Sequence, residues 1–223
     1  MVELSLAKIV QHLIENDISI QDAIERGYAN FSAVARLLKP KAEALLGRKV
    51  ILESMITSVK RAKIKYKPSL ENLKIIAESV INIRTNLAKM TVERTRRNLE
   101  RARLLSADFP EAFFQVLEGI ATLTLITDQR IFSQIRHKFG DTEILDEKHN
   151  LAAIMIQSPR EIVSTPGCIS LFYNAMSRGR INIEETISCY TETVIFLKMD
   201  DSAKAYSILT ELIANARKNL GMD

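Results

Sequence analysis

Apolar side chains recur with a helical period through the first part of the chain, and glycine, proline or capping residues separate the repeats. The period predicts helices over residues 6–14, 19–26, 31–38, 40–46 and 52–59. Asn30 is placed to cap the third of these helices, whereas Pro40 suits the first turn of the fourth and Gly47 ends it. Residues 1–67 are therefore expected to form an all-α module.

The pattern changes after residue 66, where the proline-containing segment 67–69 is typical of a linker. A short helix is predicted over residues 70–78, and residues 80–94 are rich in β-branched side chains with rough alternation. We interpret residues 80–94 as a hairpin and residues 94–103 as an exposed basic helix or loop. The elements predicted farther along are strands at residues 113–117 and 121–127 and a helix at residues 131–139.

The last third of the chain carries the clearest succession of elements. The predicted order is a strand at residues 151–156, a helix at 169–177, paired strands at 181–188 and 191–197, and a final helix capped by Asp201 or Ser202. This order is most of a ferredoxin-like βαββα(β) layout, in which the helices cover one face of an antiparallel sheet. Because the sequence given ends after the last helix, residues 121–127 are the expected donor of the missing strand.

These elements together predict an α+β protein, with an all-α module of helix-turn-helix type before a ferredoxin-like domain. We place the boundaries at residues 1–67 for the helical module, 68–147 for a linker helix and β region, and 148–223 for the second domain. No apolar run reaches the ~20 residues that span a bilayer. The first residues lack the pattern of a signal peptide. We therefore expect a soluble, cytoplasmic protein.

Charge is distributed unevenly along the chain. Residues 1–105 hold 20 Lys+Arg and 11 Asp+Glu, whereas residues 106–223 hold 11 and 16. A basic part joined to an acidic part indicates separate partners for the two. DNA is one possible partner of the basic part, although basic surfaces also occur in proteins that bind no nucleic acid.

The segment STPGCISLF at residues 164–172, followed by INIEE at 181–185 and IS at 187–188, resembles the ACT domain as it appears in aspartokinases. The resemblance covers about residues 150–213 and rests on a Pro-Gly turn, a helix and an Asn-Ile strand start at matching spacing. It implies a domain that binds an amino acid, often across two paired copies, and passes the binding on as a conformational signal. By the same resemblance, the region from residue 80 to 148 is interpreted as a second, degenerate ACT-like half.

The resemblance also implies which residues meet the ligand. Gly167 lets the backbone approach a ligand closely, and the amides of Cys168 and Ile169 open a helix whose positive end suits a carboxylate. The expected ligand contacts are Gly167, Cys168, Ile169, Asn182, Thr191 and Glu192. Alternatively, the Pro-Gly pair is only a turn and Asn182 only caps local backbone. Many aspartokinase-type sites have an acidic residue before the helix, which residues 164–166 lack, so the ligand's identity stays open.

The segment around the Gly27 turn resembles the helix-turn-helix of archaeal regulators. On this reading some side chains face a DNA groove and others meet phosphates. The groove-facing residues are Ser32, Arg36 and Lys39, and the phosphate-facing residues are Lys60, Arg61, Lys63 and Lys65. The alternative is a helical module for dimerisation or docking, because helix pairs with a glycine turn are common in all-α proteins.

Motifs for catalysis are missing from the sequence. It has no phosphate-binding glycine loop, no dinucleotide fingerprint and no zinc-protease helix. His12, His137 and His149 are scattered, and Cys168 and Cys189 have no metal-ligand spacing. We expect no catalytic residue, no metal and no cofactor. The resulting hypothesis is an amino-acid-responsive, homo-oligomeric transcription regulator, and the alternative is a regulatory subunit that docks on an amino-acid biosynthetic enzyme.

Overall fold

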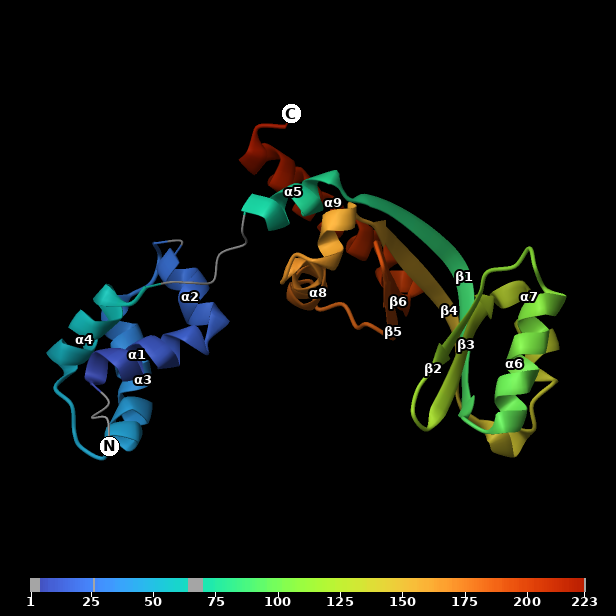
Figure 1. Cartoon of the computed structure of the whole chain (residues 1–223), viewed down its shortest axis with the longest axis horizontal. Coiled ribbons are helices and arrows are strands. Elements are labelled where there is room, and N and C mark those ends of the chain that lie inside the picture. Colours follow the sequence, from blue (N-terminus) through green and yellow to red (C-terminus); the bar gives the residue numbers. More distant parts are fainter. Residues whose placement is uncertain (1–4, 26, 64–69, 223) are drawn as a thin grey trace. The chain divides into compact units, whose positions relative to one another are not determined.

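A computed structural model describes residues 5–25, 27–63 and 70–222 of the chain (Figure 1). The chain divides into two compact units, residues 1–68 and residues 69–223. Each unit is described by itself in the following paragraphs. The boundary expected between residues 147 and 148 falls inside a strand of the second unit, β4 (Ile144–Gln157).

The described part of the first unit is helical. Its helices are α1 (Leu6–Glu15), α2 (Ile18–Glu25), α3 (Phe31–Leu46) and α4 (Leu52–Arg61). Their apolar faces meet in one core, in which Val10, Ile14 and Met55 are fully buried. The side chain of Asn30 accepts hydrogen bonds from the amides of Ser32 and Ala33, so the predicted cap of α3 is confirmed.

The third and fourth helices expected from the sequence are a single helix, α3, which contains Pro40 in its interior. Proline lacks the N–H that would bond to the carbonyl of Arg36, so the helix loses one backbone hydrogen bond there. Ala35, Leu38 and Ala42 form one buried face on both sides of the proline. Packing along this face keeps the helix continuous, and the predicted break was wrong.

The second unit is built on a six-stranded antiparallel sheet with the order β2-β3-β1-β4-β6-β5. Its strands are β1 (Val80–Glu93), β2 (Phe114–Glu118), β3 (Thr122–Asp128), β4 (Ile144–Gln157), β5 (Glu185–Cys189) and β6 (Glu192–Lys198). Its described α-helices are α5 (Leu70–Glu78), α6 (Arg96–Asp108), α7 (Gln129–Arg136), α8 (Cys168–Arg178) and α9 (Ser202–Leu220). Short 3-10 helices are η1 (Asp141–Glu143), η2 (Arg160–Val163) and η3 (Met199–Asp201).

Two predictions about the strands were wrong. Residues 80–94 do not form a hairpin, because β1 is one continuous strand whose backbone bulges at Asn86 (φ 57°) without reversing direction. The strand that completes the sheet around β4 is β1, which pairs with it from Val80 to Val92, and not the segment 121–127. That segment forms β3 and pairs with β1 and β2.

The long strands β1 and β4 are shared by two halves of the second unit. We call β2, β3, α6 and α7 the first half and β5, β6, α8 and α9 the second half, with β1 and β4 shared. The strand order is β2-β3-β1-β4 in the first half and β5-β6-β4-β1 in the second, so β1 and β4 exchange roles. Figure 1 shows both strands curving from one half into the other. The second half resembles the layout expected for residues 148–223, completed by β1.

Both halves bury the helix-facing side of their sheet in a separate apolar core. Met90 and Leu123 lie in the core of the first half, and Ile154 and Phe172 in that of the second. The opposite side of the sheet is also apolar. A further cluster of buried side chains joins both halves there and consists of Leu87, Ile126, Leu151, Ala153 and Phe196. The two halves therefore share a core as well as their central strands.

Candidate functional site

The turn at Gly167 opens helix α8 at one end of the second half. Gly167 has φ 88° and ψ −9°, a left-handed conformation that a side chain would strain. The glycine is exposed, whereas Cys168, the first residue of the helix, is 1% exposed. Glycine has no side chain with which to cap the amides that begin α8. The glycine at the start of α8 is thus at the surface, and the anion site that the sequence predicts at this helix end stays a prediction.

Asn72 of α5 holds this turn in place. Its side-chain amide donates to the carbonyl of Pro166 at 2.9 Å and to the sulfur of Cys168 at 3.0 Å. Asn72 is 6% exposed, so the contact lies within the protein. Sequence reasoning missed this residue. The sequence indicates it only as a polar side chain on the apolar face of the predicted helix 70–78, which also carries Ile75 and Ile76.

The thiol of Cys168 belongs to the core of the second half. Burial raises the pKa of this thiol, and the hydrogen bond from Asn72 opposes that effect. A thiol with a raised pKa stays protonated near neutral pH and is a poor nucleophile. The sulfur of Cys168 is therefore part of the core, and the ligand contact expected for its backbone amide stays a prediction.

The turn between β5 and β6 lies at the same end of the second half. Thr191 accepts a hydrogen bond on its side chain from Gln157 at 2.7 Å and on its carbonyl from the amide of Ser158 at 2.9 Å. These bonds tie the turn to the end of β4. Glu192 follows as an exposed side chain at the start of β6. The structure therefore places Thr191 and Glu192 beside the segment that leads from β4 to Gly167.

A hollow of 370 Å³ lies between that segment and the β5–β6 turn. Its lining residues are Arg160, Glu161, Val163, Ser164 and Tyr190. The carbonyl of Glu161 accepts from the amide and the hydroxyl of Thr165, two residues before Gly167, so the hollow and the glycine turn belong to one loop. A guanidinium, a carboxylate and a hydroxyl suit the carboxylate and ammonium groups of an amino acid.

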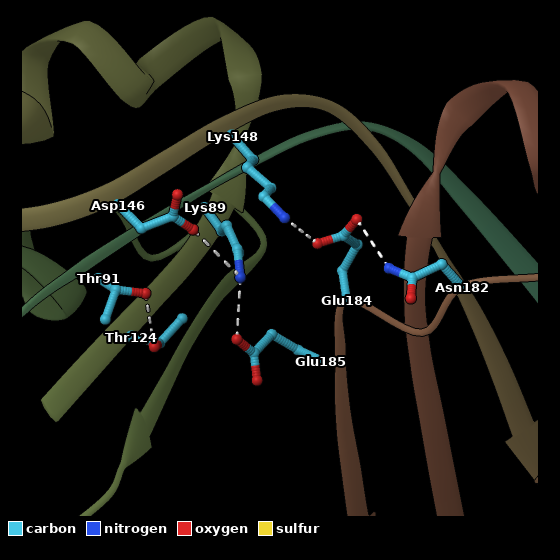
Figure 2. A network of polar contacts seen from close by, with 8 residues as sticks. All are labelled: Lys89, Thr91, Thr124, Asp146, Lys148, Asn182, Glu184 and Glu185. Carbon is cyan, nitrogen blue, oxygen red and sulfur yellow. Dashed lines mark hydrogen bonds and ion pairs between the residues drawn. The ribbon is translucent and has the colours of Figure 1, made fainter.

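Asn182 lies before β5 and not inside a strand as expected, because β5 begins at Glu185. Its amide donates to Glu184 at 3.1 Å, and Glu184 in turn pairs with Lys148 of β4. Figure 2 shows the three side chains in line, with Glu184 between the other two. Asn182 therefore connects to the centre of the sheet through an ion pair. None of the predicted ligand contacts is among the residues that line the hollow, which applies to Gly167, Cys168, Ile169, Asn182, Thr191 and Glu192.

The charged groups at the centre of the sheet form two neighbouring sets (Figure 2). Lys89 of β1 has a side chain only 7% exposed and lies 3.0 Å from Glu185 and 3.5 Å from Asp146. The side chain of Glu184 is 4% exposed. Its hydrogen bond with Lys148 lowers the pKa of the Glu184 carboxyl and raises that of the lysine, while burial opposes both shifts. This arrangement favours the charged form of each partner.

The residues predicted to contact DNA lie on α3 and at the end of α4. Arg36, Lys60, Arg61 and Lys63 are exposed, and Ser32 is half-buried. Lys39 donates to Glu43 at 2.5 Å, so its charge is already paired within α3. The backbone of Lys63 exchanges two hydrogen bonds with the side chain of Gln11, at 2.7 and 2.8 Å, which fixes the end of α4 against α1. Lys65 lies outside the described residues.

Among the residues that the structure describes, no group of three His, Cys, Asp or Glu side chains is arranged to hold a metal ion. None of the described helices combines the length and apolar character that a membrane-spanning helix needs.

The fold of the second unit, a curled antiparallel sheet with helices, is similar to that of the regulatory domains of aspartokinases. The regulatory subunit of aspartate kinase from Thermus thermophilus matches with a TM-score of 0.51 and 10% identity, over 59% of this chain and 95% of that chain. The alpha and beta subunits of an aspartokinase match with a TM-score of 0.52 and 12% identity, over 65% and 99%. Aspartate kinase from Clostridium acetobutylicum matches with 0.50 and 15% identity, over 60% and 34%.

No family model matches this sequence, and no curated protein matches it. At sequence identities of 10–15%, these matches show a similar fold and say nothing about the residues of the candidate site. The expected ACT-type domain is confirmed at the level of the fold, and the helix-turn-helix resemblance of the first unit stays a prediction.

Proposed function

We propose that the second unit is a non-catalytic sensor of a free amino acid. The observation that carries this proposal is a hollow with groups of both charges, whose lining residues Arg160 to Ser164 belong to the same loop as the exposed, left-handed Gly167 at the start of α8. The helix end and Arg160 attract the carboxylate of the ligand, and Glu161 attracts its ammonium group. Aspartokinase regulatory domains, which share the fold, support an allosteric role for such a site.

A thermal-unfolding screen of the common amino acids tests this proposal. A ligand at 100 times its dissociation constant adds about 2.7 kcal/mol to the unfolding free energy, so one or a few amino acids are expected to raise the melting temperature clearly. Arg160→Gln is expected to remove the shift. Arg103→Gln, at an exposed position of α6 outside the hollow, is its matched control. If none of the amino acids raises the melting temperature, the sensor proposal is refuted.

The first unit is the output module in this proposal, and DNA is its first candidate partner. Exposed cations support this role, namely Arg36 on α3 and Lys60 and Arg61 at the end of α4. Phosphate contacts release counterions, so retention on DNA is expected to fall steeply as salt rises. Arg36→Ala and Lys60→Ala are expected to weaken retention. Retention that neither substitution changes would contradict a role in transcription.

A regulatory subunit that docks on a biosynthetic enzyme is the second candidate. It is favoured by the match to a separate regulatory subunit of aspartate kinase over 95% of that subunit's chain. The measurement is the activity of an aspartate kinase catalytic subunit with and without this protein, over a series of amino-acid concentrations. Docking predicts that amino-acid inhibition appears only in the mixture. Sedimentation of the protein alone would show whether copies pair, as the resemblance to ACT domains implies.

A further inference from the structure

Tyr190 lies in the turn between β5 and β6 with a left-handed backbone. Its φ is 55°, and the pairing of Cys189 with Glu192 leaves only Tyr190 and Thr191 in the turn. Positive φ in such turns favours asparagine, aspartate or glycine, because a bulky side chain is disfavoured there. The tyrosine is nevertheless 65% exposed, so burial in a core does not offset the unfavourable backbone. A tyrosine at this position contributes little to folding, which points to a role in binding.

The surroundings of Tyr190 leave its ring open to a ligand. Tyr190 lines the hollow of 370 Å³ together with the loop between β4 and α8. Among the described residues, its side chain forms no hydrogen bond and no aromatic contact. Val163 of the loop also lines the hollow and is 59% exposed. The lining therefore has two large apolar side chains in addition to Arg160, Glu161 and Ser164.

The polar groups of the lining are matched by the part that all amino acids have in common. Within the part of the chain that the structure describes, the side chains of Arg160 and Glu161 form no ion pair, so both charges are available. In the proposed function they meet the carboxylate and the ammonium group of the ligand. The hydroxyl of Ser164 donates to the carbonyl of Glu161 at 3.4 Å. The side chain of the ligand then finds Val163 and Tyr190 among the described lining residues.

The first half of the unit has the same connection without the loop. In the first half the amide of Arg94, directly after β1, donates to the carbonyl of Ala121 at 3.0 Å. In the second half the amide of Ser158, directly after β4, donates to the carbonyl of Thr191 at 2.9 Å. Two residues separate β1 from α6, whereas ten residues separate β4 from α8. Only the second half therefore has a long loop that faces the turn of its outer strands.

We propose that the amino acid bound in this hollow has an apolar side chain, which packs on the ring of Tyr190 and the methyl groups of Val163. This inference rests on the amino-acid site proposed above. Each ligand methylene group that becomes fully buried strengthens binding about fourfold, and an aromatic ligand gains further by stacking on the tyrosine. A charged ligand side chain loses water there without gaining a partner of opposite charge. The hollow thus selects for apolar amino acids.

The experiment is a set of NMR titrations of the full chain with glycine, alanine, leucine, phenylalanine, lysine and glutamate. Affinity is expected to rise from glycine through alanine to leucine and phenylalanine, and to be lower for lysine and glutamate than for leucine. If lysine, glutamate or glycine binds as tightly as leucine and phenylalanine, the inference is wrong while the amino-acid site stands. If none of the six binds, the amino-acid site itself is refuted, and the inference with it.

The variant Tyr190→Asn separates binding from folding. Asparagine suits positive φ, so the melting temperature of the unliganded variant is expected to stay equal or to rise. Loss of the ring is expected to weaken leucine and phenylalanine binding about tenfold and glycine binding much less. A lower melting temperature with equal losses for all ligands would show a purely structural role and overturn the inference. Tyr206→Asn, at an exposed tyrosine of α9 outside the lining, is the matched control and is expected to leave every affinity unchanged.

Discussion

At the residue scale, Gly167 combines a left-handed backbone with an exposed position in the loop of the proposed ligand site. Gly167→Ala is expected to lower the unfolding free energy by about 1 kcal/mol, because alanine resists the left-handed conformation. The same substitution is also expected to weaken amino-acid binding. Both effects are measured by urea unfolding and by calorimetric titration.

Gly221 supplies the matched control for that substitution. It has φ +65° after α9, and a Cβ there would meet no atom within 4 Å. Gly221→Ala is expected to cost similar stability and to leave ligand affinity unchanged. Equal losses of affinity in both variants would show that backbone strain, and not the position of the turn, explains the result.

The buried carboxylate of Glu184 makes a second prediction at this scale. The pair with Lys148 lowers its pKa below the ordinary 4.5, so the folded state gains stability above that value and loses it as pH falls through the lowered pKa. Glu184→Gln is expected to cost about 1–2 kcal/mol near neutral pH, where a charged hydrogen bond is lost. The difference between the two proteins is expected to shrink on acidification.

Urea unfolding at about pH 7 and about pH 3 measures this difference. Glu211→Gln, at an exposed position of α9, is the control and is expected to change stability little at either pH. A cost that stays constant over the whole range would contradict the ion pair as its source.

At the element scale, the bulges in β1 and β4 separate the two halves within each long strand. Asn86 and Asn150 have φ values of 57° and 54°, which asparagine tolerates and β-branched residues resist. Asn86→Val and Asn150→Val are each expected to cost about 1–2 kcal/mol of unfolding free energy. Glycine at either position is expected to cost much less. Chemical unfolding of the four variants checks this, and tolerance of valine would argue that the strands do not need the bulge.

The elements show which parts of the fold were accessible from the sequence. Helical periodicity and the Asn30 cap predicted the first unit, because both are local signals. The break at Pro40 was wrong, since packing of the buried face of α3 outweighs the lost hydrogen bond. The hairpin in residues 80–94 was wrong because rough alternation does not distinguish a turn from a bulge at one asparagine.

The candidate site also has features that the sequence predicted and features that it did not. The Gly167 turn was predictable because a Pro-Gly pair before a helical period is a local pattern. Asn72 and Lys148 were not predicted as parts of the site, because their partners lie 94 residues and 36 residues away along the chain. Arg160 and Glu161 were missed because they line a hollow only when the fold brings the β5–β6 turn opposite them.

At the scale of the whole molecule, the second unit contains a complete sheet and three of the described apolar cores. A protein that begins at Ser69 is expected to unfold in one cooperative transition and to keep its amino-acid response. Calorimetry and the thermal screen on this truncated protein test both points. An unfolded product would show that the first unit is needed for the second to fold.

The exchange of β1 and β4 between the halves has a consequence for cutting the chain. A cut between Glu143 and Ile144 would leave β1, β2 and β3 in one piece and β4, β5 and β6 in the other. Each piece would expose a fourteen-residue edge strand, β1 or β4, whose partner lies in the other piece. Neither piece contains the complete sheet of the second unit. Mixed in solution, the pieces should recombine into the native unit, which makes this connection a natural place to split the molecule into a complementation pair.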